Sequence, residues 1–243
     1  MKIKHISFDS KTTPKVCVAI IATTEAAFIM DWQETKREDI DVIEWRADYF
    51  TGDDSAILTL LEKEHRPVIY TIRTKEEGGE LPYQKDQYII RYKQAIDSGV
   101  IDVIDLEWAR DYEGKTMLID YAKAKGVKVI TSYHDFHSTP SYEDGKKLLS
   151  ALANDGGDIV KLAVMPESKQ DVLTLLALTV EAEYLITQPV ITMSMGEQGT
   201  ISRLLGEWTG SILTFGSVSQ ASAPGQLSVT QLTHSLQDLH RYF

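Results

Sequence analysis

The stretch that decides the fold is "DIVKLAVMPESKQDVLTLLALTVEAEYLITQPVITMSM", residues 158–195. It begins with an apolar run typical of a buried strand at 158–164 and continues with a helical pattern at 169–183. A second β-rich run follows at 189–195. A strand, a helix and another strand in direct succession predict a unit of an α/β fold.

The same alternation extends outward from this unit in both directions. β-rich runs occur at 15–22, 41–45, 67–72, 102–107, 128–133, 158–164, 189–195 and 211–216. Helical patterns follow them at 24–33, 55–65, 87–96, 115–126, 142–155, 169–183, 200–208 and 226–240. Eight strands, each followed by a helix, in a chain of 243 residues predict a (β/α)8 TIM barrel.

The barrel has one competitor, a doubly wound open sheet. That fold usually carries a glycine fingerprint after its first strand, and "IIATTEA", residues 20–26, has none. We therefore expect residues 1–243 to form a single (β/α)8 catalytic domain. The alternating start "KIKHISF", residues 2–8, predicts a short extra strand or hairpin that closes the barrel floor.

Composition limits the classes of partner. A net charge of −11 argues against nucleic acid and anionic membranes, which bind basic faces. Cys17 is the single cysteine, so an intramolecular disulfide is excluded. The start of the chain has no apolar core typical of a secretory signal, and no later stretch reaches membrane-spanning length. We expect a cytoplasmic protein.

Lys161 is an amine inside the apolar run 158–164. With a period of two, Lys161 shares a strand face with Ile159 and Ala163. A buried ammonium must be solvated, paired or kept neutral. The structural interpretation is a strand-edge lysine whose head reaches water; the functional one is a reactive amine.

Ionisable side chains also gather where other predicted strands end, which is where barrel enzymes place their chemistry. They are Glu44 and Arg46 in "IEWRAD", Arg73 and Glu77 in "TIRTKEEGG", and His134 in "TSYHDF". Each has a structural explanation, such as an ion pair or a loop cap, and Arg203 resembles any arginine on a helix face. Their gathering at one end of a barrel favours a functional site.

These residue types suit one chemistry. A desolvated lysine near arginines is a nucleophile toward ketones and would form an imine. The protonated imine acidifies the adjacent C–H bond, which a histidine can deprotonate. Arginines bind carboxylates bidentately, so a small oxo acid is implied as substrate. The residues alone predict a Schiff-base lyase that acts on a carboxylated ketone.

The motifs "EWRAD", "TIRTKEEGGE", "SYHDF", "VKLAVMP", "ITMSMGEQGTISRLLG" and "SAPGQ" occur in order along the chain. In order and spacing they resemble the type I 3-dehydroquinate dehydratases, hydro-lyases of the shikimate pathway. The resemblance implies a (β/α)8 enzyme that converts 3-dehydroquinate to 3-dehydroshikimate by syn elimination. It also implies a homodimer without metal or organic cofactor.

The resemblance further implies roles for individual residues. Lys161 would form the imine, His134 would carry the proton, and Glu77 would orient His134. Arg203 would bind the substrate carboxylate. The remaining substrate contacts would come from Glu44, Arg46, Arg73, and from Ser222 and Gln226, which would close over the substrate from the last loop. Thr23 and Thr24 receive no role.

Two alternatives stay open on the sequence. A class I aldolase shares the barrel and the imine lysine but breaks a C–C bond, usually in a phosphorylated sugar, and "SMGEQGTISR" could hold an anion. A catalytically silent barrel used for binding or assembly is the other. Borohydride trapping separates the second from both enzymes.

Overall fold

The computed structural model describes residues 1–36, 38–110, 112–218 and 222–242. Eight parallel strands form one sheet in the order β10-β3-β4-β5-β6-β7-β8-β9. The strands are β3 (Lys15–Ile20), β4 (Val42–Arg46), β5 (Val68–Thr71), β6 (Val103–Glu107), β7 (Lys128–Asp135), β8 (Ile159–Val164), β9 (Val190–Ser194) and β10 (Leu213–Gly216). A backbone bond from the amide of Ile212 to the carbonyl oxygen of Val190, 2.9 Å long, brings the two end strands together.

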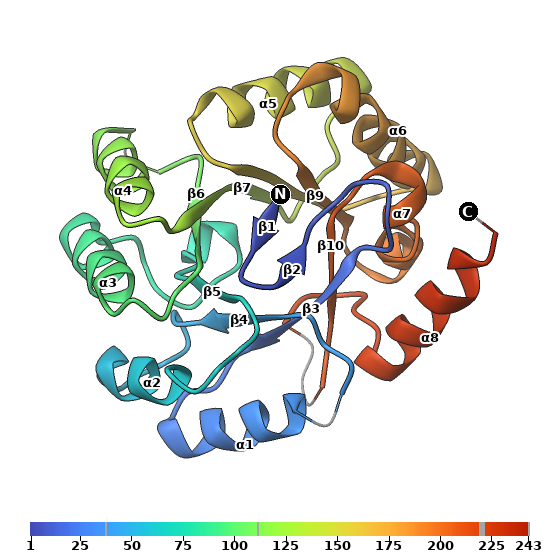
Figure 1. The fold of residues 1–243 in the computed structure, drawn as a ribbon. Helices are drawn as coiled ribbons and strands as arrows, with labels where there is room; N and C mark the ends of the chain where they lie inside the picture. Colours follow the sequence, from blue (N-terminus) through green and yellow to red (C-terminus); the bar gives the residue numbers. More distant parts are fainter. Residues whose placement is uncertain (37, 111, 219–221, 243) are drawn as a thin grey trace.

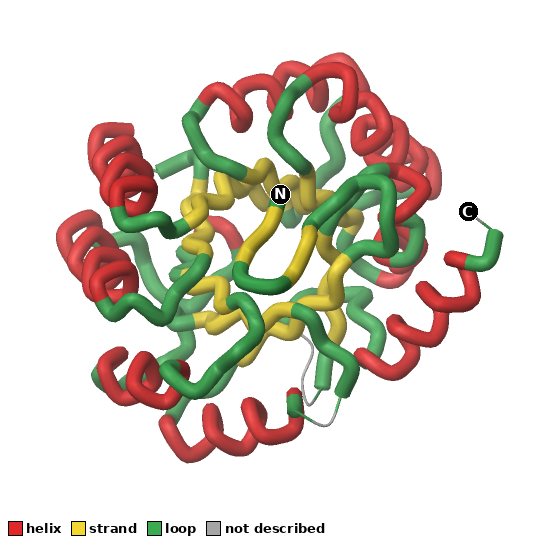
Figure 2. Tube along the Cα trace, in the orientation of Figure 1, coloured by secondary structure: helices red, strands yellow, loops and turns green. Residues whose placement is uncertain are grey.

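Helices form an outer ring around the strands (Figure 1). They are α1 (Glu25–Thr35), α2 (Asp54–Leu61), α3 (Lys85–Asp97), α4 (Tyr112–Ala124), α5 (Tyr142–Asn154), α6 (Lys169–Leu185), α7 (Gly206–Thr209) and α8 (Val229–His240). Figure 2 shows the ring of yellow strands enclosed by red helices, so the predicted (β/α)8 barrel is confirmed.

One predicted helix is only partly an α-helix. Residues 200–208 form the end of a 3-10 helix, η2 (Glu197–Arg203), and the start of the four-residue α7. The chain here lies directly on the barrel rim: a Cβ atom added to Gly199 would stand 2.2 Å from the carbonyl oxygen of Ser194. Close packing of glycine backbone therefore replaces the regular helix that the apolar spacing predicted.

The N-terminal hairpin is present. It pairs β1 (Lys2–Ile3) with β2 (Ile6–Ser7) in antiparallel register. Ile3 and Phe8 are buried in the same apolar cluster as Val42 and Ile130, which lie near the amino ends of their strands. The hairpin crosses the centre of the barrel in Figure 1, so it closes the floor as predicted.

The barrel interior changes from apolar to charged along the strands. Its lower part is filled by Cys17, Val42, Ile69, Val103, Ile130, Ile159, Ile191 and Leu213. Two residues further along three of these strands are Glu44, Asp105 and Lys161, all at least 96% buried. These three come from β4, β6 and β8, which are alternate strands, and alternate strands supply one layer of a barrel interior.

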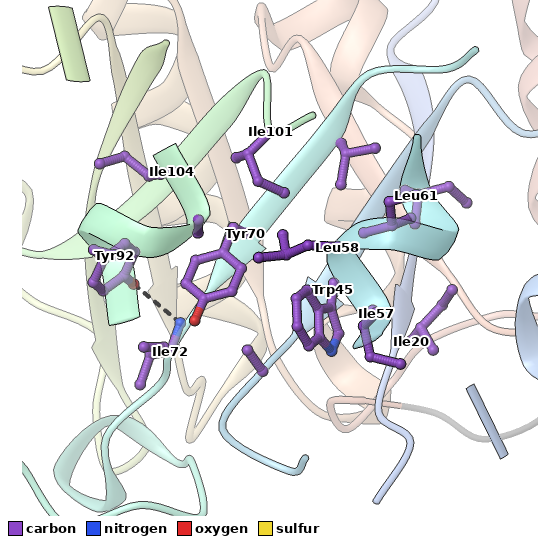
Figure 3. Close-up of a cluster of buried hydrophobic side chains, with 14 of the residues drawn as sticks. Ile20, Trp45, Ile57, Leu58, Leu61, Tyr70, Ile72, Tyr92, Ile101 and Ile104 are labelled. Carbon is purple, nitrogen blue, oxygen red and sulfur yellow. Dashed lines mark hydrogen bonds between the residues drawn. The ribbon is translucent and has the colours of Figure 1, made fainter. Parts of the chain in front are cut away.

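Aromatic side chains fill the space between the strands and the helices (Figure 3). The rings of Trp45 and Tyr70 lie edge to face at 5.2 Å, and those of Tyr70 and Tyr92 at 5.3 Å. The Tyr92 hydroxyl accepts a hydrogen bond from the amide of Ile72 and donates one to the carbonyl oxygen of Asp105. This cluster therefore fixes α3 against the residues that follow β5, where Arg73 lies, and against β6, which holds Asp105 and Glu107.

Candidate active site

A pocket lies at the carboxyl ends of the strands. Charged and polar side chains line it together with an apolar wall: Glu44, Arg46, Arg73, Glu77, Gly78, His134, Phe136, Lys161, Ala163, Met193, Met195, Phe215, Ser222, Ala223 and Gln226. Concave sites with a few convergent polar groups on such a wall are the usual form of small-molecule sites.

Lys161 lies at the base of the pocket, on β8. Its side chain is 5% exposed, and its Nζ donates to Oδ2 of Asp105 at 2.9 Å. Glu44 Oε1 is 3.7 Å from the same nitrogen, and the ring centroid of Phe215 is 4.9 Å away. The lysine is therefore buried and paired, so the interpretation of a strand-edge lysine reaching water is wrong.

Asp105 and Arg73 form the centre of a buried charge network. Arg73 Nη2 donates to Asp105 Oδ1 at 2.7 Å, and the Ser132 hydroxyl donates to the same oxygen at 2.5 Å. Burial alone would raise the pKa of Asp105, but the positive charges of Arg73 and Lys161 hold it well below its usual range. Asp105 is therefore a fixed anion.

Arg73 is also held by Glu107, whose Oε1 lies 3.3 Å from Nη1. Burial acts to lower the pKa of Arg73, but the carboxylates of Asp105 and Glu107 outweigh it and raise that pKa well above its usual value. Most of the Arg73 donors are thus used inside the protein, although the side chain borders the pocket.

His134 is the histidine of the pocket, and its side chain is 10% exposed. Its Nδ1 lies 2.9 Å from Oε2 of Glu77, and its backbone amide donates to the same oxygen. Burial, together with the positive charges of Arg73 and Lys161, lowers the pKa of His134 well below 6.5. Its imidazole is therefore neutral at pH 7 and able to accept a proton.

Glu77 is held in place by the turn that follows β5. Burial is the main cause that raises its pKa to about 8. Arg110 Nη2 lies 3.9 Å from its Oε1, and Arg73 Nη1 lies 3.7 Å from its Oε2. Gly79 allows the turn, since a Cβ atom there would stand 1.9 Å from the carbonyl oxygen of Arg73.

The other two arginines differ in their partners. Arg46 donates two hydrogen bonds of 2.8 Å to the carboxylate of Asp48. Arg203, which is 2% exposed, donates to the carbonyl oxygen of Pro224 and has its Nη1 4.0 Å from the sulfur of Met193. Within the described residues Arg203 has no carboxylate partner and its Nε has no hydrogen-bond partner. Burial lowers its pKa to about 10.

The last loop reaches the pocket with Ser222 and Gln226. The Gln226 Oε1 accepts from the Ser222 amide, and the Gln226 Nε2 donates to the Ser222 hydroxyl oxygen, both at 2.9 Å. Residues 219–221 of the same loop lie outside the described residues.

The structure thus gathers most of the residues that the sequence singled out. Lys161, His134, Glu77, Glu44, Arg46, Arg73, Ser222 and Gln226 all line the pocket. Arg203 is not among the lining residues, but its Nη1 lies 4.0 Å from the sulfur of Met193, which does line the pocket. Their roles stay predictions, because a position beside the pocket does not establish chemistry.

Sequence reasoning missed Asp105, Glu107 and Ser132. The signal was present in "DVIDLE", where a period of two places Val103, Asp105 and Glu107 on one strand face. Two carboxylates on the interior face of a buried strand require cationic partners. That requirement could have directed attention to Arg73 and Lys161.

The fold and the site define a class: a (β/α)8 barrel with a buried, carboxylate-paired lysine and a neutral histidine at the carboxyl ends of its strands. Residues 16–242 match the type I 3-dehydroquinase family. The chain therefore belongs to the type I 3-dehydroquinase family, as the sequence motifs predicted.

Curated relatives and solved structures agree with this assignment. The chain is 42% identical over 239 residues to the 3-dehydroquinate dehydratase of Klebsiella pneumoniae, with 95% of this chain and 94% of that one covered. The enzyme of Listeria welshimeri is 38% identical over 248 residues, with coverage of 99% and 98%. The type I enzyme from Clostridium difficile, solved with covalently modified comenic acid, is 37% identical with a TM-score of 0.93 and coverage of 100% and 98%.

Proposed function

We propose that this member of the type I 3-dehydroquinase family dehydrates 3-dehydroquinate to 3-dehydroshikimate through an imine on Lys161. The reaction is a step of the shikimate pathway, which leads to the aromatic amino acids. The observation that carries the mechanism is the buried Nζ of Lys161 at the base of a polar pocket that also contains a neutral His134. Family membership favours this function over the aldolase alternative.

In the first step the ammonium of Lys161 passes one proton to the neutral imidazole of His134, and Nζ adds to the C3 carbonyl of the substrate. The imidazolium then returns that proton to the former carbonyl oxygen. Water leaves and a protonated imine forms. Burial favours this step, because the amine does not need to be stripped of a bulk water shell when the substrate arrives.

In the second step Nε2 of His134 removes a proton from C2. The electrons move toward the imine nitrogen and give an enamine, and the C1 hydroxyl then leaves as water after it receives a proton from the imidazolium. The bond between Nδ1 and Glu77 leaves Nε2 as the nitrogen that faces the substrate. Hydrolysis of the conjugated imine releases the product and restores the amine.

Substrate binding falls to the remaining predicted residues. Arg203, a buried cation without a carboxylate partner in the described part of the chain, suits the substrate carboxylate. Ser222 and Gln226 offer a hydroxyl and an amide, and Glu44 offers a carboxylate to substrate hydroxyls. Arg46 and Arg73 position the ring mainly through the carboxylates that they hold. The cycle uses no metal or organic cofactor.

Borohydride trapping tests this function. Reduction in the presence of substrate or product is expected to add one ligand mass to the peptide that contains Lys161. Lys161→Ala is expected to lose both the adduct and turnover, which is followed by the absorbance of the conjugated product. An adduct that persists in Lys161→Ala, or turnover without any adduct, contradicts the mechanism.

We further propose a homodimer. Leu173, Val180 and Tyr184 form an exposed apolar stripe on α6, with exposed fractions of 57%, 38% and 80%, and Trp208 of α7 is 62% exposed. The two helices lie side by side (Figure 1). Exposed apolar patches of this kind mark association sites.

We also propose that residues 1–243 act as one catalytic domain in the cytoplasm. The free, buried Cys17 suits a reducing compartment. None of the helices in the described ranges is long and apolar enough to span a membrane. A single cooperative unfolding transition and recovery of activity in the soluble cell fraction would test the two statements.

A further inference from the structure

We propose that Asp105 is a catalytic residue: it is the fixed counter-ion of the protonated imine on Lys161. This inference rests on the proposed function and adds a residue that the sequence motifs did not supply. The proposal rests on one contact: Oδ2 of Asp105 accepts a 2.9 Å hydrogen bond from Nζ of Lys161, which would become the imine nitrogen.

The position of Asp105 is fixed independently of Lys161. Its other oxygen, Oδ1, accepts from Arg73 Nη2 and from the Ser132 hydroxyl. Its backbone carbonyl accepts from the Tyr92 hydroxyl at 2.6 Å. Asp105 therefore stays in place, and stays ionised, while the lysine changes its covalent state.

The charge balance of imine formation gives this anion its role. An ammonium and a ketone yield a protonated imine and water, so the nitrogen carries one positive charge before and after imine formation, and two of the ammonium protons leave with the carbonyl oxygen as water. Of the three N–H bonds of the ammonium, one survives in the imine. We assign that N–H to Asp105, which directs the new C=N bond to the opposite side of the nitrogen, toward the pocket.

Glu44 does not replace Asp105 in this role. Its Oε1 is 3.7 Å from Nζ and already accepts a 2.8 Å hydrogen bond from the Thr71 hydroxyl. The other titratable groups that interact with Asp105 are Arg73, His134 and Glu77. Arg73 and His134 supply no negative charge, and Glu77 is bonded to His134. Asp105 is thus the anion in direct contact with the reacting nitrogen.

Loss of this charge is expected to affect steps of the cycle differently. Without Asp105 the protonated imine loses its proton at lower pH, because an adjacent opposite charge moves the pKa of a buried group by about 1 to 3 units. The enamine carries no charge on nitrogen, so its formation does not need the anion. The effect therefore appears in how the population of protonated imine depends on pH.

The test compares Asp105→Asn with the wild type in cyanoborohydride trapping, because this reagent reduces protonated imines far faster than neutral ones. The trapping rate of Asp105→Asn relative to wild type is expected to fall at least about tenfold between pH 6 and pH 9. Ser132→Ala is the matched control: it removes a hydrogen bond to Asp105 and leaves the charge, so its ratio is expected to stay constant. A constant or rising ratio for Asp105→Asn overturns the proposal.

A measurement on the wild type makes the test independent of whether Asp105→Asn folds. With ¹⁵N-labelled lysine and saturating product, the imine nitrogen is expected to keep the chemical shift of a protonated imine up to pH 9. The shift of a neutral imine at pH 8 overturns the proposal. Absence of any adduct on wild-type Lys161 counts instead against the proposed function, so the two failures are distinguishable.

Discussion

At the scale of single residues, the site works by placing groups of opposite charge where water is excluded. A lysine that is 5% exposed would be costly alone, but Asp105 beside it removes that cost and leaves the amine in contact with the pocket. His134, in contrast, is uncharged, since burial and its cationic neighbours lower its pKa. The two residues that we propose to react with substrate thus have complementary states at neutral pH.

His134→Ala is expected to lower kcat by about 10²- to 10⁴-fold while still allowing some covalent trapping at Lys161, because the proton carrier is lost but the amine remains. His137→Ala is the matched control, since His137 is exposed in the next loop. Chelators are expected to leave wild-type activity unchanged. Inhibition by a chelator that zinc reverses would overturn this assignment.

Glu77→Gln is expected to change the pH dependence of stability. The raised pKa of about 8 means that folded Glu77 keeps its proton at pH values where the unfolded chain, with a pKa near 4.5, has lost it. Wild-type stability therefore falls as pH rises toward 8, whereas glutamine does not titrate. The lowered pKa of His134 makes the stability of the protein rise with pH, but only below pH 6.5. The test of Glu77 therefore uses pH values above 6.5.

Between pH 6.5 and pH 8 the free energy of unfolding of Glu77→Gln, relative to wild type, is expected to increase by on the order of 2 kcal/mol. Urea titrations at several pH values measure this difference. A difference that is independent of pH would mean that Glu77 is ionised throughout the window.

At the scale of elements, a feature could be predicted from the sequence when the residues that produce it lie close together in the chain. Each strand and most helices carry their own apolar period, and helices α6 and α8 begin with capping boxes at Ser168 and Ser228. The pairing of Asp105 with Lys161 joins positions 56 residues apart and exists only because the barrel closes. Arg203 was likewise indistinguishable from a helix-face arginine until the segment 200–208 proved to be packed on the barrel rim.

The turn after β5 gives an element-scale prediction. Gly79→Ala is expected to destabilise the protein by about 3 kcal/mol or more and to lower kcat at least about tenfold, because the new Cβ displaces the turn that holds Glu77. Gly126→Ala is the control: its φ is +78° but its Cβ would have open space, so a cost of about 1 kcal/mol and unchanged kcat are expected. Melting curves and steady-state rates measure both, and equal behaviour of the two variants would contradict the role of the turn.

The last loop, residues 217–226, is expected to become more protected when substrate is bound covalently. Ser222 and Gln226 bond to each other, and ligand contact would replace that bond with bonds to the ligand. Hydrogen exchange of the peptide covering the loop, before and after reduction of the imine, measures the change. Equal exchange in a fully modified sample would remove both residues from substrate binding.

At the scale of the whole molecule, the barrel separates stability from chemistry along its axis. The lower interior is apolar and closed by the hairpin, and the upper interior holds the charge network. That division follows from the order of apolar and charged residues along each strand, and the sequence predicted it for Glu44 and Lys161 but not for Asp105. Association surfaces could not be predicted from the sequence, because an exposed apolar residue on a helix looks the same in sequence as one that packs against the barrel.

The stripe of α6 with Trp208 is such a surface, and it supplies the last prediction. Association in a dimer would bury Leu173, Val180, Tyr184 and Trp208, whereas a glutamate in the centre of that contact would have to lose its water shell opposite its own copy. Trp208→Glu is therefore expected to weaken the dimer at least about 100-fold, since buried tryptophans are frequent hot spots.

Met30→Glu on α1, where Met30 is 68% exposed, is the matched control and is expected to leave the dimer intact. Size-exclusion chromatography with light scattering measures the outcome: twice 27.3 kDa for wild type and Met30→Glu, and 27.3 kDa for Trp208→Glu. A dimer that survives Trp208→Glu unchanged would place the interface on another face, and a wild type that is monomeric at every concentration would remove the dimer itself.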